Sequence, residues 1–220
     1  MALWNVVDAG CNRAPTPPAG LQCLPRHHDA VLKDRCGPTH YLLIPTVRRA
    51  GVESPELLRD DEPEYFVDAW AARDRVIAAS GRTDVRAGEI GLAINSRWGR
   101  SQDQLHIHID FVRPEVRDAV SRWLHEGGSS PSIELSGHAY RIVHVASLRE
   151  PSPFQRVASA GDTPQQRGTN TIAVVSDGAA GFYLLFDRAD PARLDRGHAE
   201  EILVPRNCGE RADGKSGPTP

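Results

Sequence analysis

The sequence predicts an α+β fold in which an antiparallel sheet carries packed helices and continues into a C-terminal extension that also contains strands. Three observations predict this fold: short apolar strands separated by turn residues, two segments with helical spacing between them, and further strand-like segments after Gly127-Gly128. A chain of 220 residues can bury a substantial core. We expect a core domain over residues 1–126, an extension packed on it over residues 127–208, and a disordered tail over residues 209–220.

The first predicted elements are a β-hairpin and a helix. Residues 30–32 and 40–45 are apolar, β-branched or aromatic, and the segment between them ends in Gly37-Pro38, which favours a turn. From Asp61 to about Ser80, apolar side chains recur every three or four residues and Gly81 follows. This spacing predicts one amphipathic helix that packs on the sheet.

The remaining elements follow the same two patterns. Residues 114–124 predict a second helix, which Gly127-Gly128 ends. The other segments read as strands, the last three of them around a loop rich in Ser, Gly, Pro and Gln: residues 89–94, 105–112, 139–145, 171–175 and 181–186.

The strand over residues 105–112 has two chemically distinct faces. Side chains alternate along a strand, so the apolar residues Leu105, Ile107 and Ile109 point to one face. The other face of this half-buried strand then carries polar and titratable groups: Gln104, His106, His108 and Asp110. The preceding Trp98-Gly99-Arg100-Ser101 supplies a flexible glycine, a cation and a hydroxyl, which suit an anionic oxygen. The segment therefore predicts a phosphate site.

Two alternatives compete with a phosphate site. Paired histidines on a strand can be surface residues without a function, or His106, His108 and Asp110 could supply three zinc ligands. Arg100 argues against zinc, because a guanidinium is repelled by a divalent cation and forms charge-assisted hydrogen bonds with phosphate. We expect neither a metal nor another cofactor.

The histidine strand resembles the signature of the histidine-triad (HIT) superfamily of nucleotide hydrolases and transferases, with Asp110 in place of the third histidine. Within that superfamily, the run from Asn95-Ser96 through Gly99-Arg100-Ser101-Gln102 to His108 is similar to the CDP-diacylglycerol pyrophosphatase family, which likewise lacks the third histidine. The resemblance covers nearly the whole chain and includes residues 3–7, 31–34, 41–46, 51–55, 69–73, 137–140 and 200–202.

This resemblance implies a HIT-like hydrolase that cleaves the pyrophosphate of a nucleotide diphosphate ester, with CDP-diacylglycerol as substrate and CMP and phosphatidate as products. It implies that His108 is the nucleophile of a nucleotidyl-histidine intermediate, that His106 positions it, and that His40 is a further active-site histidine. A soluble nucleotide conjugate is the alternative substrate. The alternative function is a repurposed protein, such as a cyclase, that binds or transforms another small molecule without hydrolysis.

The residues expected to bind the substrate are Lys33, Asp34, Asn95, Arg100, Ser101, Gln102, Gln104 and Asp110. The resemblance implies that Asp34 accepts hydrogen bonds from ribose hydroxyls and that Lys33 lies over a phosphate. The side chains of the Gly-Arg-Ser-Gln run suit the phosphate oxygens. Asp110 could orient His108, bond to Arg113, or mark a pocket that has lost hydrolysis.

Composition restricts the partners. A net charge of −3 argues against a nucleic-acid binder, which needs a basic surface. We find no apolar run of about eighteen residues and no signal before Leu3, whereas members of the family usually carry an amino-terminal anchor or signal. We therefore leave the location open between the cytoplasm and a membrane or exported site, and expect membrane contact only through a lipid substrate. Triad proteins often pair, so a homodimer is a further expectation.

Four cysteines allow three complete disulfide pairings. Cys11 and Cys23 flank a proline-rich turn, Cys36 follows the first hairpin strand, and Cys208 could tie the tail back. The family often places a cysteine directly after the histidine strand, where this chain has Phe111. The pairing therefore stays open.

Overall fold

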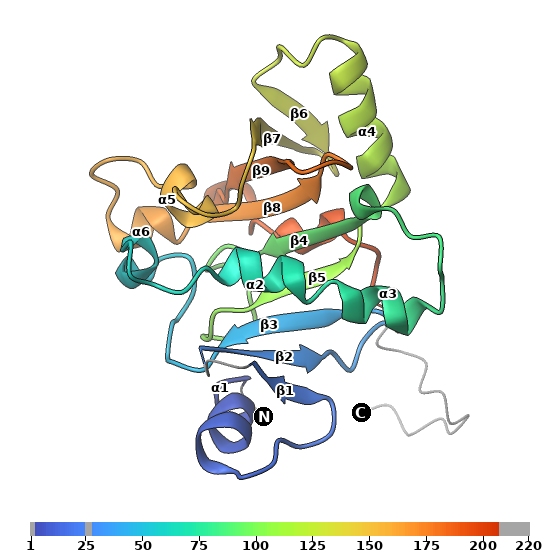
Figure 1. Ribbon diagram of the computed structural model, residues 1–220. Coiled ribbons are helices and arrows are strands. Elements are labelled where there is room, and N and C mark those ends of the chain that lie inside the picture. The colour runs from blue at the N-terminus through green and yellow to red at the C-terminus, as the bar shows by residue number, and fades with distance from the viewer. Residues whose placement is uncertain (1–2, 25–27, 207–220) are drawn as a thin grey trace, which may run out of the picture.

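The structure, a computed structural model, describes residues 3–24 and 28–206. These residues contain one nine-stranded sheet in the order β1-β2-β3-β5-β4-β8-β9-β7-β6, in which every neighbouring pair is antiparallel. Its strands are β1 Leu21–Cys23, β2 Asp29–Lys33, β3 Tyr41–Pro45, β4 Ile90–Ile94, β5 Ile107–Phe111, β6 Ser132–Leu135, β7 His138–Val145, β8 Asn170–Ser176 and β9 Phe182–Arg188. The predicted α+β class with an antiparallel sheet is confirmed (Figure 1).

Short helices connect the strands: α1 Leu3–Val7, η1 Asp8–Arg13, η2 Pro55–Leu58, α2 Tyr65–Ala71, α3 Asp74–Ser80, η3 Ala87–Glu89, α4 Pro114–His125, α5 Pro153–Val157, α6 Pro164–Arg167, η4 Pro191–Arg193 and η5 Ala199–Ile202. The predicted hairpin is confirmed as β2 and β3, and the other predicted strands appear as β4, β5, β7, β8 and β9. The predicted second helix is α4. Two further strands, β1 and β6, were not predicted from the sequence.

The prediction of one helix from Asp61 to Ser80 was wrong, because two helices occupy this segment. Pro63 precedes the first, which begins at Tyr65. At the junction, the Arg73 amide donates to the Trp70 carbonyl and the Arg75 amide to the Ala72 carbonyl, three residues back rather than four. This tighter turn changes the direction of the chain. Gly81 ends α3 with a φ of 67°, as its conformational freedom predicts.

Helices α2, α3 and α5 cover one face of the sheet (Figure 1). Their buried side chains, including Phe66, Val76 and Phe154, pack in one apolar cluster with Ile107 and Ile109 of β5. The odd-numbered residues of β5 therefore point into a dry core. This packing fixes the strand from one side and directs its even-numbered residues to the other.

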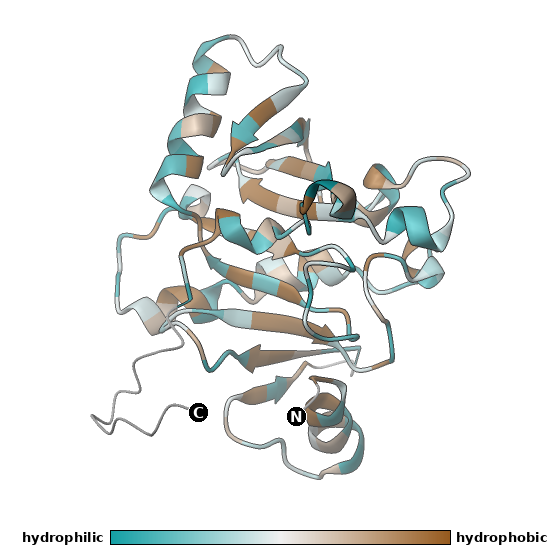
Figure 2. Cartoon of the chain, turned by 180° about the vertical axis from the view of Figure 1, so that it is seen from behind, coloured by the Kyte–Doolittle hydropathy of each residue, from teal (hydrophilic) through white to brown (hydrophobic). Residues whose placement is uncertain are grey.

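The second face carries two separate apolar clusters. One joins α1 to the first strands through Val7, Leu21 and Leu42, and the other holds α4 and η5 against the central and later strands. Figure 2, seen from behind, shows mainly brown strands and an α4 banded in teal and brown, as expected of a helix with one buried side. His108 pairs with Leu42 of the first cluster and with Ala93 of the second. The histidines therefore lie between the two clusters.

The extension predicted over residues 127–208 contributes strands to the same sheet. β8 pairs with β4, with Leu92 opposite Val174, and β9, β7 and β6 follow outward. Hydrogen bonds thus run without interruption from the predicted core domain into the extension. The domain boundary itself stays a prediction, and the predicted tail lies outside the described residues.

Cys11 and Cys23, the pair that flanks the proline-rich turn, form a disulfide. Cys36 is disulfide-bonded as well, and Cys208 lies outside the described residues. No helix within residues 3–24 and 28–206 has the length and apolar character needed to cross a bilayer.

We predict that Ile107→Ala lowers the free energy of unfolding by about 2–5 kcal/mol, because Ile107 is fully buried and its truncation leaves a cavity behind the histidine strand. Val143→Ala is the control: Val143 also lies in a strand but is 38% exposed, so the cost should stay below about 1 kcal/mol. Urea unfolding followed by circular dichroism measures both. Equal losses would contradict the two-sided packing of β5.

Candidate active site

Strand pairing brings His40, His108 and Asp110 together. Leu42 lies opposite His108 and Tyr41 opposite Ile109, so His40, one step before β3, faces the end of β5 near Asp110. Because side chains alternate, His40 and Leu42 share a face with His108 and Asp110. The alternation predicted for residues 104–110 is confirmed, and the resemblance placed His40 beside it.

Three of these side chains form a hydrogen-bonded relay. Asp110 Oδ2 lies 3.1 Å from His40 Nδ1, and His40 Nε2 lies 2.9 Å from His108 Nδ1. The other Asp110 oxygen accepts hydrogen bonds from Thr39 Oγ1 at 2.6 Å and from the Phe111 amide at 2.8 Å. Asp110 therefore acts on His108 through His40.

Two of the alternatives for Asp110 were that it orients His108 or that it bonds to Arg113, and the relay favours the first. Its contacts are with Thr39, His40 and the Phe111 amide, whereas Arg113 pairs with Glu115. Since Asp110 turns toward His40, its carboxylate does not converge with His106 and His108 on a common point. The geometry thus gives no support to a zinc site on this strand. The role of Asp110 as a substrate ligand stays a prediction.

The expectation of a half-buried strand was wrong, because the polar face is buried too. His106 is 8% exposed, and His108 and Asp110 are less exposed still. Burial lowers the pKa of His106 and lowers that of His108 strongly, and neighbouring positive groups lower the pKa of His108 further. Both imidazoles are therefore held neutral.

His106 Nδ1 lies 2.7 Å from the Gln104 carbonyl, and its ring packs edge-on against His108 at 4.9 Å between centroids.

Glu200 and Arg206 also lie in the group of polar side chains around His108. Neither residue was assigned a role from the sequence. Glu200 Oε2 lies 3.3 Å from His108 Nε2. The Arg206 guanidinium donates to Glu200 and, at 3.1 Å, to Asp34. The side chain of Asn95, a predicted site residue, accepts a hydrogen bond from the Glu200 amide at 3.0 Å. The resemblance included Glu200-Glu201-Ile202, and that was the only signal in the sequence.

A cavity of about 430 Å³ opens beside these groups. Its polar lining contains four of the eight predicted substrate residues together with Arg206, and its apolar lining comes from the first turns and strands. The polar residues are Lys33, Asp34, Arg35, Ser101, Gln102, His106, His108 and Arg206, and the others are Leu3, Val6, Pro18, Ala19, Leu21, Leu32 and Leu42. The cavity thus offers both an anion site and a surface that suits an apolar or aromatic group.

Four predicted substrate residues do not line this cavity: Asn95, Arg100, Gln104 and Asp110. The Arg100 guanidinium pairs with Glu53 and Asp103, and its side chain is only 5% exposed. Gln104 Nε2 donates to the carbonyls of Pro45 and Val47. Both side chains thus have internal partners, and their contact with substrate stays a prediction.

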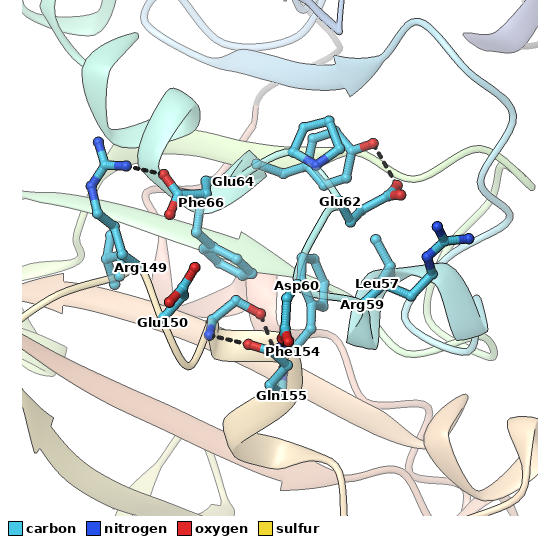
Figure 3. Close-up of a pocket in the computed structure, with 14 residues that line it drawn as sticks. Leu57, Arg59, Asp60, Glu62, Glu64, Phe66, Arg149, Glu150, Phe154 and Gln155 are labelled. Carbon is cyan, nitrogen blue, oxygen red and sulfur yellow. Dashed lines mark hydrogen bonds and ion pairs between the residues drawn. The ribbon is translucent and has the colours of Figure 1, made fainter.

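A second hollow, on the side of the sheet covered by α2 and α5, is much smaller (Figure 3). Its volume of about 30 Å³ holds little more than a water molecule. Several of its charged groups are paired: Arg149 with Glu64 (Figure 3), and Glu62 with Arg49. This hollow contains no histidine and is not a candidate active site.

We predict that His108 stays neutral at pH 6.5, where an unperturbed imidazole is about half protonated. Because a carboxylate only accepts hydrogen bonds, the relay starts with His40 Nδ1–H and leaves the His108 proton on Nδ1. Long-range ¹H–¹⁵N NMR spectra report both the charge and the tautomer. An imidazolium at pH 7, or a proton on Nε2 of the neutral ring, would contradict this arrangement.

Comparisons with known proteins agree with the resemblance seen in the sequence. A model of the family described as CDP-diacylglycerol pyrophosphatase matches residues 1–210. A CDP-diacylglycerol pyrophosphatase from Yersinia pestis is 37% identical over 224 aligned positions, which cover 91% of this chain and 81% of that relative. The match includes β5, the strands around it and the segment that carries Glu200 and Arg206. The chain therefore belongs to the CDP-diacylglycerol pyrophosphatase family.

Proposed function

We propose that this protein hydrolyses the pyrophosphate bond of CDP-diacylglycerol to CMP and phosphatidate through a nucleotidyl intermediate on His108. Family membership supports the substrate and the reaction. The relay from Asp110 through His40 to His108 is the observation that carries the mechanism. It favours one tautomer of a buried, neutral imidazole, whose Nε2 lone pair is then the nucleophile.

In the first step, the His108 Nε2 lone pair attacks the phosphorus next to cytidine and the bond to the bridging oxygen breaks. Phosphatidate leaves with that electron pair. His108 acquires positive charge as the N–P bond forms, and the relay stabilises this charge through His40 and the Asp110 carboxylate. Water then cleaves the N–P bond, which releases CMP and restores neutral His108.

Glu200 and Arg206 would exchange partners when substrate binds. In the free protein Glu200 covers His108 Nε2, which has a negligible exposed surface. A phosphate that approaches this nitrogen displaces the Glu200 carboxylate and takes its place against the Arg206 guanidinium. Arg206 would thus supply the positive charge beside the phosphate, a role that was predicted for Arg100.

The other polar residues of the cavity fit the remainder of the nucleotide. Asp34, held by Arg206, faces the cavity where a ribose hydroxyl could donate to it. Lys33 donates from Nζ to the carbonyls of Asp34 and Gly37, both at 2.8 Å, and so shapes this turn. Ser101 and Gln102 lie on the same cavity wall as His106.

We further propose that the core is HIT-like and that catalysis needs no metal ion. Support for the first comes from the alternating His106 and His108 on a central strand and from His40 on the neighbouring strand. Support for the second comes from the relay, which supplies a nucleophile without a Lewis acid, and from Arg206, which supplies the positive charge.

We predict that His108→Asn lowers the rate of CMP release from CDP-diacylglycerol in detergent micelles by about 10⁴-fold or more, because it removes the nucleophile. Asp110→Asn should lower it by about 10²–10⁴-fold, since an amide can stabilise the wrong His40 tautomer. His144→Gln, at an exposed histidine, is the control and should leave the rate unchanged. Chromatography of CMP in the presence of a chelator is the measurement. Full activity in His108→Asn would exclude the proposed nucleophile. Loss of wild-type activity with chelator, in protein that circular dichroism shows to stay folded, would exclude the metal-free mechanism.

We predict that Arg206→Ala lowers kcat/KM for CDP-diacylglycerol by about 10²–10³-fold, because it removes the charge that meets the displaced phosphate. Arg206→Lys should recover part of this loss. Arg59→Ala, at an arginine paired with Asp61 on the surface, is the control. Steady-state kinetics measure all three variants, and equal values for Arg206→Ala and the wild type would remove Arg206 from the site.

A further inference from the structure

A second group of ligand-type side chains lies in the C-terminal half of the chain. His138 begins β7, Asp187 lies in β9, and Asp195 follows η4. One nitrogen of the histidine and one oxygen of each carboxylate lie within 4.8 Å of one another. None of the three residues lines the cavity beside His108.

The distances in this group are unusual for hydrogen bonds. His138 Nδ1 lies 3.4 Å from Asp195 Oδ2 and 3.8 Å from Asp187 Oδ2, whereas N–H···O hydrogen bonds measure about 2.7–3.2 Å. His144, on the same strand, provides the contrast, because its Nε2 lies 2.9 Å from Asp177 Oδ2. His138 is thus close to two carboxylates without a short hydrogen bond to either.

The shorter of these distances suits two ligands that share a small cation, and the longer one, 3.8 Å, would close on binding. Ligand atoms about 2.0–2.1 Å from a tetrahedral zinc ion lie about 3.3 Å apart, close to the shorter of the two distances. An octahedral magnesium ion brings neighbouring ligands to about 2.9 Å and prefers oxygen donors only. The nitrogen and two carboxylates therefore favour a zinc-type ion.

Backbone amides already hold both carboxylates. Asp187 Oδ1 accepts from the Arg188 amide at 2.7 Å, and Asp195 Oδ1 accepts from the Gly197 amide at 2.8 Å. In each side chain the second oxygen, Oδ2, is the atom that faces His138. Hydrogen bonds of this kind orient metal ligands before the ion arrives.

The local charge also favours a cation. Among residues 3–24 and 28–206, His138 is the sole basic side chain within ion-pair distance of Asp187 or Asp195. A divalent ion would neutralise two carboxylates that repel each other.

We propose that His138, Asp187 and Asp195 form a binding site for one Zn²⁺ ion, with water as the fourth ligand. The ion would tie β7 and β9 to the turn that leads to the active site. Gly197, two residues after Asp195, accepts a hydrogen bond from the Ser96 amide at 3.0 Å, and Arg196 accepts one from the Ser96 hydroxyl at 2.5 Å. The ion would thus brace this part of the sheet, and its ligands lie outside the cavity beside His108.

The test is Zn²⁺ titration of the untagged, chelator-treated chain by calorimetry, with metal content measured by mass spectrometry. We expect one Zn²⁺ per chain, a higher melting temperature with Zn²⁺, and much weaker binding of Mg²⁺. His138→Gln and Asp195→Asn should each weaken Zn²⁺ binding by about tenfold or more. His144→Gln, in the ordinary hydrogen-bonded pair, should bind Zn²⁺ as the wild type does.

Circular dichroism without metal establishes that each variant is folded, and Asp187→Asn replaces either variant that is not. Absence of Zn²⁺ binding by the wild type would overturn the proposal. So would equal affinity in the wild type, His138→Gln and Asp195→Asn, which would place the ion on other histidines. None of these readouts depends on hydrolysis, so the proposal stands or falls separately from the pyrophosphatase activity.

Discussion

The hydrogen bond between His40 and His108 is the interaction on which the rest of the active site depends. It joins two neighbouring strands, and its geometry follows from the register that places Leu42 opposite His108. A shift of one residue would turn every side chain of β5 to the other face and separate the two histidines. The apolar core behind Ile107 and Ile109 prevents that shift. Stability of the sheet and orientation of the His108 imidazole therefore depend on the same strand register.

Burial of this polar group is costly and needs compensation. Four titratable or hydrogen-bonding side chains, Thr39, His40, His108 and Asp110, lie almost without exposure on one face of the sheet. They satisfy one another in a continuous chain of hydrogen bonds, which a buried polar network requires. Within this hydrogen-bonded group of side chains, His108 Nε2 is the one buried atom without a hydrogen bond. The hydrogen bonds thus satisfy every atom of the relay except Nε2, the atom proposed to attack phosphorus.

The sequence predicted the parts of the site that depend on local pattern. Alternation along one strand placed His106, His108 and Asp110 on one face, and the Gly-Pro turn predicted the hairpin that carries His40 toward them. Contacts between distant segments could not be predicted this way. Arg100 was a reasonable phosphate ligand until Glu53 proved to lie beside it, and Arg206 carries no local pattern that marks it. The break between α2 and α3 also escaped prediction, because apolar spacing continues through the turn.

If a phosphate displaces the Glu200 carboxylate from His108, as proposed, substrate binding is an exchange of anions. The total charge around Arg206 changes little when a phosphate replaces a carboxylate, so charge alone contributes little to affinity. Selection then depends on shape: a tetrahedral phosphate can meet both the guanidinium and the imidazole nitrogen, whereas a planar carboxylate contacts them from one edge. An uncharged nucleoside has no anionic group that could replace the Glu200 carboxylate in its ion pair with Arg206. On this proposal, the free protein excludes ligands that lack a phosphate.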